Sequence, residues 1–274
     1  MIVTLFLIIN WRTKRLLRKQ KKLETLVAER TLEIQQKNDQ LKDLNSTKDK
    51  LFSIISHDLR SPFNAILGFQ DLLLNSYSEF SDADRLSMIR QVHTTTNQTY
   101  YLVENLLNWA RIQTNNIQPH PIRINLGKVI LEKFDLYRDI AEAKGISFNH
   151  QLTDELFAFA DNNLLETILR NLINNAIKFT PSGGFILVKA KKELNIITIS
   201  VSDSGIGMTQ EQIETLFNLE KTQSKDGTNG EKGSGLGLIL CKEFVEMNNG
   251  TISVESQIGK GSTFSFTIPA LPAE

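Results

Sequence analysis

One continuous helical pattern, from Leu16 to about Asn75, constrains the fold of this chain more than any other feature. Apolar residues recur there with alternating spacings of three and four. Eight of the twelve positions in this seam hold Leu, Ile or Val: Leu16, Leu23, Val27, Ile34, Leu41, Leu44, Leu51 and Ile55. So narrow and long an apolar seam is typical of a coiled coil. The other seam positions are polar, so we expect a marginal parallel dimer, which would act either as a signal-transmitting linker or as a plain dimerising stalk.

The residues before this seam form an apolar run followed by a cationic block. Residues 1–11 are almost wholly apolar, and residues 12–22 contain seven Lys and Arg without any acidic residue. This order matches the cytoplasmic end of a membrane helix. Eleven helical residues rise about 16 Å, whereas the hydrocarbon core is about 30 Å thick. We interpret residues 1–11 as the inner half of a membrane helix whose upstream part lies outside this chain. A buried or interfacial N-terminal segment is the alternative.

A second amphipathic helix follows the first after a turn at residues 75–81. Ser81 is a suitable N-cap, and Asp82 and Asp84 lie at the positive end of the helix dipole. Pro62 should kink or locally break the first helix. Since two antiparallel helices cannot bury two apolar stripes alone, we expect a dimeric helical hairpin that forms a four-helix bundle. The predicted divisions are a basic juxtamembrane coiled-coil linker at 12–45 and the hairpin at 46–116.

The composition changes near residues 115–121, and mixed elements follow this linker. Helices are predicted at 128–144 and 161–179, and strands at 146–152, 185–190, 196–202, 250–255 and 263–268. Helices on one face of a mixed sheet give an α/β-sandwich (α+β) domain over residues 117–274. The fold class is therefore multidomain, with an all-α coiled coil and hairpin before an α+β domain.

The overall charge excludes some functions. The chain has 31 Lys and Arg against 31 Asp and Glu, so its formal net charge is zero, and nucleic acid is not expected as a partner. One cysteine, Cys241, excludes an intramolecular disulfide framework and a multi-cysteine metal site.

Three polar motifs in the second domain carry its chemistry. Asn171, Asn175 and Lys178 share one helix face, where amide oxygens suit Mg²⁺ and an ammonium suits phosphate. Each motif alone is weak evidence, because asparagines on a helix are usually solvated and an Asp-Gly turn can be structural. Asp203 ends a strand before Gly205 and Gly207, and a buried carboxylate can accept the amino group of a purine. Gly-rich backbone opens a further helix, which is an anion site in principle, at Gly233, Gly235, Leu236 and Gly237.

The order of these motifs resembles the ATP-binding domain of sensor histidine kinases, the GHKL or Bergerat fold. NLINNAIKFT resembles the N box, DSGIGM and GSGLGL the two glycine boxes, and LFNLE, with Phe217, a degraded F box. The resemblance implies that Asn175 coordinates Mg²⁺ with support from Asn171, and that Asp203 recognises adenine. It implies phosphate contact by Lys178 and a place beside the base for Phe179. The glycines and Leu236 would shape the pocket and its lid.

The first helix carries a string, His57-Asp58-Leu-Arg60-Ser61-Pro62, that resembles the H box of the dimerisation and phosphoacceptor domain. A histidine followed by an aspartate on a helix is usually a surface pair. Neutral imidazole is nevertheless a good phosphoryl acceptor, and an adjacent carboxylate can orient the ring. The resemblance makes His57 the phosphoacceptor, with Asp58 as base or orienter and with Arg60 and Ser61 completing the motif.

These features predict a sensor histidine kinase that uses ATP and Mg²⁺ to phosphorylate His57 and passes the group to an aspartate of a response regulator receiver domain. Phosphatase activity toward the regulator is left open by Ser61, which stands where Thr or Asn is usual. The expected setting is the cytoplasmic side of a bacterial inner membrane, with the chain as a homodimer. Two alternatives stay open: another GHKL ATPase, which would not need His57, and a catalytically silent scaffold.

Overall fold

The computed structural model describes residues 2–114, 116–153, 156–218, 225–231, 233 and 235–271. The side chains of residues 2–10, 40, 43, 44, 47 and 49–57 lie outside this description. The chain divides into two compact units, residues 1–53 and 54–274, and each is described by itself.

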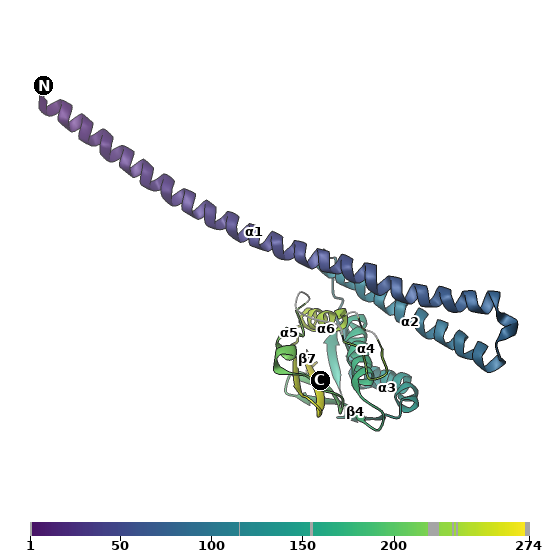
Figure 1. Cartoon of the computed structure of the whole chain (residues 1–274). Helices are drawn as coiled ribbons and strands as arrows, with labels where there is room; N and C mark the ends of the chain where they lie inside the picture. The colour runs from purple at the N-terminus through teal and green to yellow at the C-terminus, as the bar shows by residue number, and fades with distance from the viewer. Residues whose placement is uncertain are drawn as a thin grey trace. The chain divides into compact units, whose positions relative to one another are not determined.

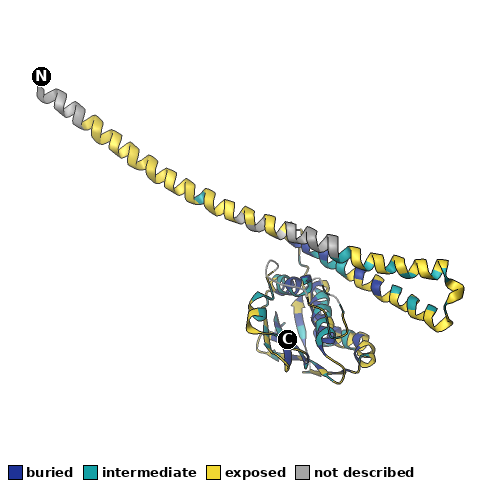
Figure 2. Ribbon diagram, viewed as in Figure 1, coloured by how far each residue is buried: buried dark blue, intermediate teal, exposed yellow. Residues whose placement is uncertain are grey.

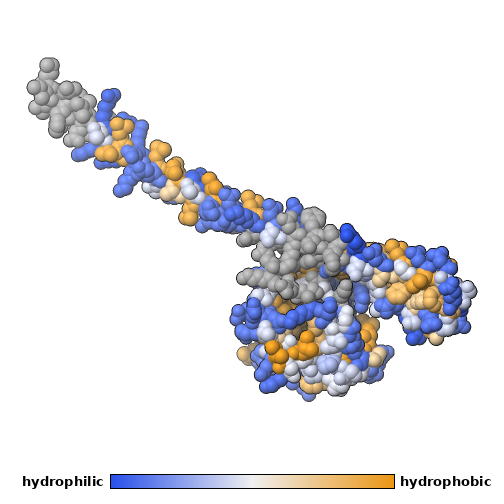
Figure 3. Space-filling model, in the orientation of Figure 1, coloured by the Kyte–Doolittle hydropathy of each residue, from blue (hydrophilic) through white to orange (hydrophobic). Residues whose placement is uncertain are grey.

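The first unit belongs to one long helix, α1 (Ile2–Asn75), which the heptad pattern predicts from Leu16 onward (Figure 1). Its described side chains are almost all exposed (Figure 2), including apolar seam residues such as Leu16 and Leu23. Figure 3 shows hydrophobic patches along the described part of this largely hydrophilic helix. Intrahelical ion pairs join Glu33 to Arg30 and Lys37. A single chain leaves the seam uncovered, which is the expected condition of one strand of a coiled coil. Within the described part of the chain, no helix is both apolar and long enough to span a bilayer.

The second unit begins with the end of α1, which is followed by the predicted turn and by α2 (Asp82–Gln113). Pro62 lies inside α1 without ending it. The turn contains the short helix η1 (Tyr77–Glu79), and the side chain of Arg85 donates to the Tyr77 carbonyl oxygen at 2.7 Å and 2.9 Å. Ser81 and Asp84 form a capping box, so the predicted start of the second helix is confirmed.

The rest of the second unit is built on a five-stranded mixed sheet with strand order β2-β4-β5-β7-β6. The pair β2–β4 is parallel and the other pairs are antiparallel. The strands are β2 (Ser147–Leu152), β4 (Phe185–Glu193), β5 (Ile196–Asp203), β6 (Ile252–Gln257) and β7 (Gly261–Pro269). The helices α3 (Leu126–Ala143), α4 (Asn162–Phe179) and α6 (Leu236–Met247) pack on the sheet and on one another (Figure 1). This confirms the predicted α+β layers.

Alternating burial along the strands places the core between the sheet and the helices. The pattern in β5 buries Ile197, Ile199 and Val201 toward the helices, where α4 contributes Leu169 and Ile173. Burying one face of each strand and one stripe of each helix is what holds the layers together. The core therefore fixes the polar face of α4 and the end of β5 relative to each other.

Two short strands and one short helix were not predicted from the sequence. The strands β1 (Ile122–Asn125) and β3 (Phe157–Ala160) pair with each other in a separate two-stranded sheet. The helix α5 (Gln210–Thr215) is capped by Thr209. A four-residue strand carries too little alternation for its pattern to be recognised before its partner is known.

Candidate nucleotide site and phosphoacceptor helix

The helix α4 presents the asparagine motif from a fixed position. Asp161 caps the helix, because its Oδ1 accepts the backbone N–H groups of Asn163 and Leu164 at 2.9 Å and 3.1 Å. Its Oδ2 accepts the N–H of His120 at 2.9 Å, which ties the linker to the start of the helix. The apolar stripe of α4 is buried in the core, so the opposite stripe must carry the polar side chains.

Asn171 lies against the start of α6, where the second glycine box begins. A Cβ added to Gly237 would lie 3.2 Å from the Oδ1 of Asn171, a tight contact that shows how closely the two motifs approach each other. The Nδ2 atom of Asn171 is buried and has no hydrogen-bond partner in the structure as described. The structure thus brings Asn171 and Gly237 together.

Asn175 and Asn174 differ in their surroundings, although they are neighbours. Asn175 is half-buried on the same stripe as Asn171, one turn further along α4. Asn174 instead donates to the Tyr137 hydroxyl at 3.2 Å, which gives it a structural partner on α3. The described residues contain no group of three His, Cys, Asp or Glu side chains that could hold a metal ion. A divalent cation here would rely on amide oxygens, water and phosphate, which are the hard oxygen ligands that Mg²⁺ accepts.

Asp203 ends β5 as a buried carboxylate, only 8% exposed. Its Oδ1 accepts the backbone N–H groups of Gly205 at 2.8 Å and Ser262 at 3.3 Å. Burial raises the pKa of the Asp203 carboxyl, and the two hydrogen bonds from Gly205 and Ser262 oppose part of that shift. No donor among the described residues reaches Oδ2, so this oxygen can accept an amino group from a ligand.

Close backbone contacts explain the first glycine box beside Asp203. A Cβ on Gly205 would lie 2.4 Å from the Phe179 carbonyl oxygen and 2.6 Å from Asp203 Oδ1. Gly207 has a φ of +66°, and a Cβ there would lie 2.0 Å from the Gln257 carbonyl oxygen. At Gly205 only glycine avoids the clash. At Gly207 only glycine avoids both the clash and the strain of a left-handed backbone. The box therefore packs the end of β5 against the end of α4.

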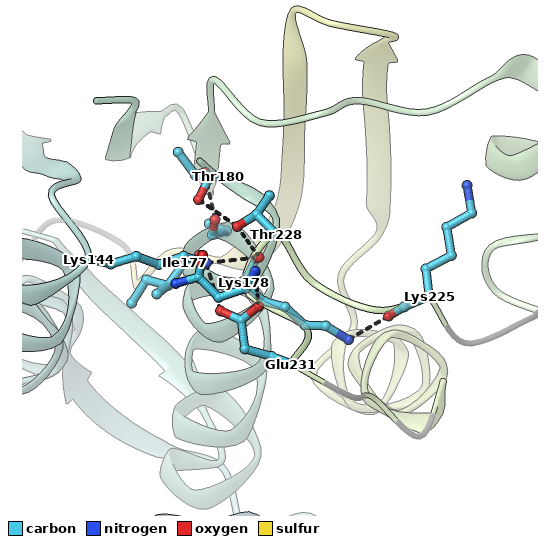
Figure 4. A network of polar contacts seen from close by, with 9 residues as sticks. Lys144, Ile177, Lys178, Thr180, Lys225, Thr228 and Glu231 are labelled. Atoms are coloured by element: carbon cyan, nitrogen blue, oxygen red, sulfur yellow. Dashed lines mark hydrogen bonds and ion pairs between the residues drawn. The ribbon is translucent and has the colours of Figure 1, made fainter. Parts of the chain in front are cut away.

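The motif lysine, Lys178, is covered by a turn formed by residues 225–231, which precede the second glycine box. Its Nζ donates to the Lys225 carbonyl oxygen at 2.7 Å and lies 4.8 Å from the centre of the Phe179 ring (Figure 4). Burial lowers the pKa of Lys178, and the nearby carboxylates of Asp226 and Glu231 oppose this effect. The ammonium is thus partly desolvated and within reach of an exchangeable neutral acceptor.

The second glycine box forms the start of α6. Gly235 is the N-cap with a φ of +73°, and Leu236 is fully buried. Gly233 is half-buried, whereas its neighbours 232 and 234 lie outside the described residues. The N–H groups of the first helical turn point out of this start and are the donors an anion requires. Phe217 follows α5 and is half-buried, and Asn218 is exposed; Leu219 and Glu220, the last two residues of the F box, lie outside the described residues.

The backbone of the phosphoacceptor motif is helical, as predicted. His57 lies in α1, but its side chain is outside the described residues. Asp58 is half-buried, while Arg60 and Ser61 are exposed on the same helix. The roles assigned to these four residues therefore stay predictions.

Sequence reasoning missed the residues that hold the 225–231 turn in place. Lys144, at the end of α3, reaches Glu231 across 87 residues of sequence, and Thr228 bonds to the end of α4. Only Lys144 carried any signal, as a cation at the end of the helix predicted at 128–144, and that signal does not indicate its distant partner.

Two family models match the chain. Residues 47–115 match the His Kinase A (phospho-acceptor) domain, and residues 160–272 match the histidine kinase-, DNA gyrase B- and HSP90-like ATPase. The autoinducer 2 sensor kinase/phosphatase LuxQ of Vibrio vulnificus is 33% identical over 235 residues, which cover 83% of this chain. The chain spans only 27% of that relative's length.

Solved structures give the same picture. Histidine kinase ShkA in complex with AMPPNP aligns over 82% of this chain and 46% of its own, with a TM-score of 0.58 and 25% identity. Histidine kinase ThkA in complex with the response regulator protein TrrA aligns over 85% of this chain and 66% of its own, with a TM-score of 0.57 and 21% identity. The second likeness shows the fold alone.

Proposed function

This chain belongs to the sensor histidine kinases, and from that premise we propose that it transfers the γ-phosphoryl group of ATP to the imidazole of His57. The environment of Asp203 is the observation that supports the ATP-binding part of this proposal. Asp203 has a buried carboxylate with one oxygen held by backbone N–H groups and the other open to an amino group. Such a group selects a base that presents an amino donor, as adenine does.

The other motif residues fit a triphosphate beside that base. Lys178 supplies a partly desolvated cation, and the start of α6 supplies backbone donors. Asn175 would hold Mg²⁺ with Asn171 beside it, and the ion would neutralise phosphate charge during transfer. Because phosphoryl transfer depends mainly on placement and charge neutralisation, these groups account for what the ATP domain contributes.

At His57 the chemistry requires a neutral ring with a free nitrogen lone pair. The imidazole nitrogen forms the new N–P bond while the bond from the γ-phosphorus to the bridging oxygen breaks and ADP leaves. Asp58 would hold the proton on the other ring nitrogen and stabilise the positive charge. The support for this step is the match of residues 47–115 to the phosphoacceptor domain.

The test uses γ-labelled ATP with Mg²⁺ and measures label that is stable to base and labile to acid. His57→Gln should remove this label while binding of an ATP analogue persists, and Asp203→Asn should remove both. Label that survives His57→Gln contradicts the assignment of His57. ATP hydrolysis without protein label favours a GHKL ATPase. The absence of both label and nucleotide binding favours a silent scaffold.

The next acceptor is proposed to be an aspartate of a response regulator. Its support is the family membership and the ThkA likeness, in which a kinase of this fold is in complex with a response regulator protein. Phosphohistidine is a high-energy donor, so incubation of labelled protein with receiver domains should move label to a base-labile acyl phosphate on one of them. The LuxQ relative is described as a kinase/phosphatase, so the same assay run from phosphorylated regulator tests regulator dephosphorylation by this chain.

A homodimer is proposed for the hairpin. Several seam side chains of α2 are exposed in the single chain, namely Leu86, Ile89, Tyr100 and Leu107. Exposed apolar residues at helical spacing need a partner surface, and a second hairpin supplies it. Analytical ultracentrifugation should give twice the chain mass of 31.0 kDa, and a monomer at micromolar concentration contradicts the proposal.

A further inference from the structure

The side chain of Lys144 ends in a buried polar cluster outside the motifs already described. It is 8% exposed, and its Nζ donates to the Ile177 carbonyl oxygen at 2.7 Å and the Lys178 carbonyl oxygen at 3.0 Å. It also donates to Glu231 Oε1 at 2.7 Å (Figure 4). A buried ammonium with three acceptors, one of them charged, is fully satisfied. Lys144 therefore joins the C-terminal end of α4 to the 225–231 turn.

Glu231 uses its other oxygen to close the turn on itself. Its Oε2 accepts the N–H of Asn229 at 2.8 Å, and its carbonyl oxygen accepts the N–H of Gly227 at 2.8 Å. Burial alone would raise the pKa of Glu231, but the hydrogen bonds from Lys144 and backbone N–H groups outweigh it and lower the pKa. The carboxylate is thus a bridge between Lys144 and the backbone of the turn.

The 225–231 turn also holds Lys178. The N–H and the hydroxyl of Thr228 donate to the Lys178 carbonyl oxygen at 3.0 Å and 3.2 Å. Gly227 packs so closely that an added Cβ would lie 2.6 Å from Lys178 Cγ. The Lys178 ammonium donates to the Lys225 carbonyl oxygen. Backbone, stem and ammonium of Lys178 are all in contact with one short turn (Figure 4).

We propose that Lys144 and Glu231 are positioning residues for ATP, which fix the 225–231 turn against α4 and so hold Lys178 oriented toward the nucleotide phosphates. The inference rests on the proposed function, since it assigns no chemistry to the pair itself. A lysine side chain has large rotamer freedom, and ordering it before binding removes that entropic cost from the binding step. The pair acts on phosphate and not on the base, because Asp203 recognises the base from a different element.

The first experiment measures the turn without nucleotide. Amide hydrogen exchange at Gly227 and Thr228 should be slow in the full chain, because both N–H groups are bonded within the cluster. Glu231→Gln and Lys144→Met should each accelerate this exchange about tenfold or more, whereas the strands of the sheet keep their protection. Unchanged exchange at Gly227 and Thr228 would overturn the proposal, whatever the chain does with ATP.

The second experiment separates phosphate from base. For Glu231→Gln, the affinity for AMPPNP and the apparent affinity for ATP should fall about tenfold, as for the loss of one charge-assisted hydrogen bond. The affinity for adenosine and the autophosphorylation rate at saturating ATP should change less than about twofold. The double variant Lys144→Met/Glu231→Gln should lose no more AMPPNP affinity than either single variant, because the two residues act as one unit. Glu231→Asp, which keeps the charge, should recover part of the loss.

The matched control is Lys133→Met, which removes another Lys–Glu ion pair between α3 and α4, that of Lys133 with Glu166, away from the turn. It should leave AMPPNP and adenosine affinities unchanged. If Glu231→Gln lowers the affinities for adenosine and AMPPNP equally, the variant is generally unfolded and the proposal is overturned. Tighter binding of AMPPNP to this variant would also overturn the proposal. If the unaltered chain binds no AMPPNP, the proposed function fails, and the exchange experiment still decides whether the pair holds the turn.

Discussion

The ammonium group of Lys178 donates a hydrogen bond to the backbone carbonyl oxygen of Lys225 at 2.7 Å. The two residues are 47 positions apart, and the bond links the N box on α4 to the turn that precedes the second glycine box. A neutral carbonyl is a weaker acceptor than a phosphate oxygen, so this bond can be exchanged when a nucleotide enters. Lys178 is thus held in place without being locked to an anion.

The pH dependence of ATP affinity should report the state of Lys178. Burial lowers its pKa below the ordinary 10.5, so the ammonium loses its proton at a lower pH than an exposed lysine does. The affinity for AMPPNP should therefore weaken as the pH rises toward that midpoint from below, and it should be constant near neutrality. Isothermal titration calorimetry between pH 7 and pH 10.5 checks this. Lys178→Arg keeps its charge over that range and should flatten the profile; an identical profile in the variant contradicts the role of Lys178.

Substitution of Gly205 tests the close packing at the first glycine box. Gly205→Ala places a Cβ 2.4 Å from the Phe179 carbonyl oxygen, and neither backbone atom can move without disturbing α4 or β5. We expect a destabilisation of about 1–3 kcal/mol and at least a tenfold loss of nucleotide affinity. Gly127→Ala is the control within the same domain, because its Cβ would meet only the Asn125 side chain at 3.5 Å. Chemical denaturation and nucleotide titration of both variants test this prediction. A Gly205→Ala variant with unchanged stability and nucleotide affinity contradicts the close contact with the Phe179 carbonyl oxygen.

Much of this fold could be predicted because its elements are long or carry strong local signals. The part of α1 from Leu16 to Asn75 follows from the heptad spacing and the helical pattern after it, and α2 begins where Ser81 is expected to cap it. The end of α4 and the start of α6 could be located because Lys178 and Gly235 belong to recognisable sequence motifs. Periodicity and capping act within a few residues of chain, so a sequence records them directly.

What could not be predicted depends on contacts between distant segments. The strands β1 and β3 exist because they pair with each other, which no pattern within Ile122–Asn125 reveals. The partner of Lys144 lies 87 residues away, and a lysine at a helix end has many possible acceptors. Only the fold brings Lys144, Glu231 and Lys178 together, so the site could be named by its motifs while its supporting contacts could not.

Removal of the α4 cap should cost stability without touching the nucleotide. Asp161→Ala loses two N–H bonds at the start of α4 and the bond from His120, and Asp161 is buried. A lost N-cap costs about 0.5–2 kcal/mol, and a buried site favours the upper part of that range. Ser81→Ala removes an exposed cap on α2 and should cost less. Thermal denaturation should show the larger fall in Tm for Asp161→Ala, and equal shifts contradict the importance of burial.

The basic block at residues 12–22 should bind anionic membranes. Its side chains are exposed on α1, and Arg15 stacks over Trp11 with its guanidinium carbon 5.2 Å from the ring centre. Each cation near an anionic surface contributes about 1 kcal/mol, and salt screens this attraction. Co-sedimentation with phosphatidylserine vesicles should therefore be strong at low salt and weak at high salt, and phosphatidylcholine vesicles should bind only through apolar residues. Replacement of Lys19, Lys21 and Lys22 by Gln should weaken only the salt-sensitive part. Binding that ignores both salt and these charges would assign membrane attachment to the apolar run at residues 1–11 instead.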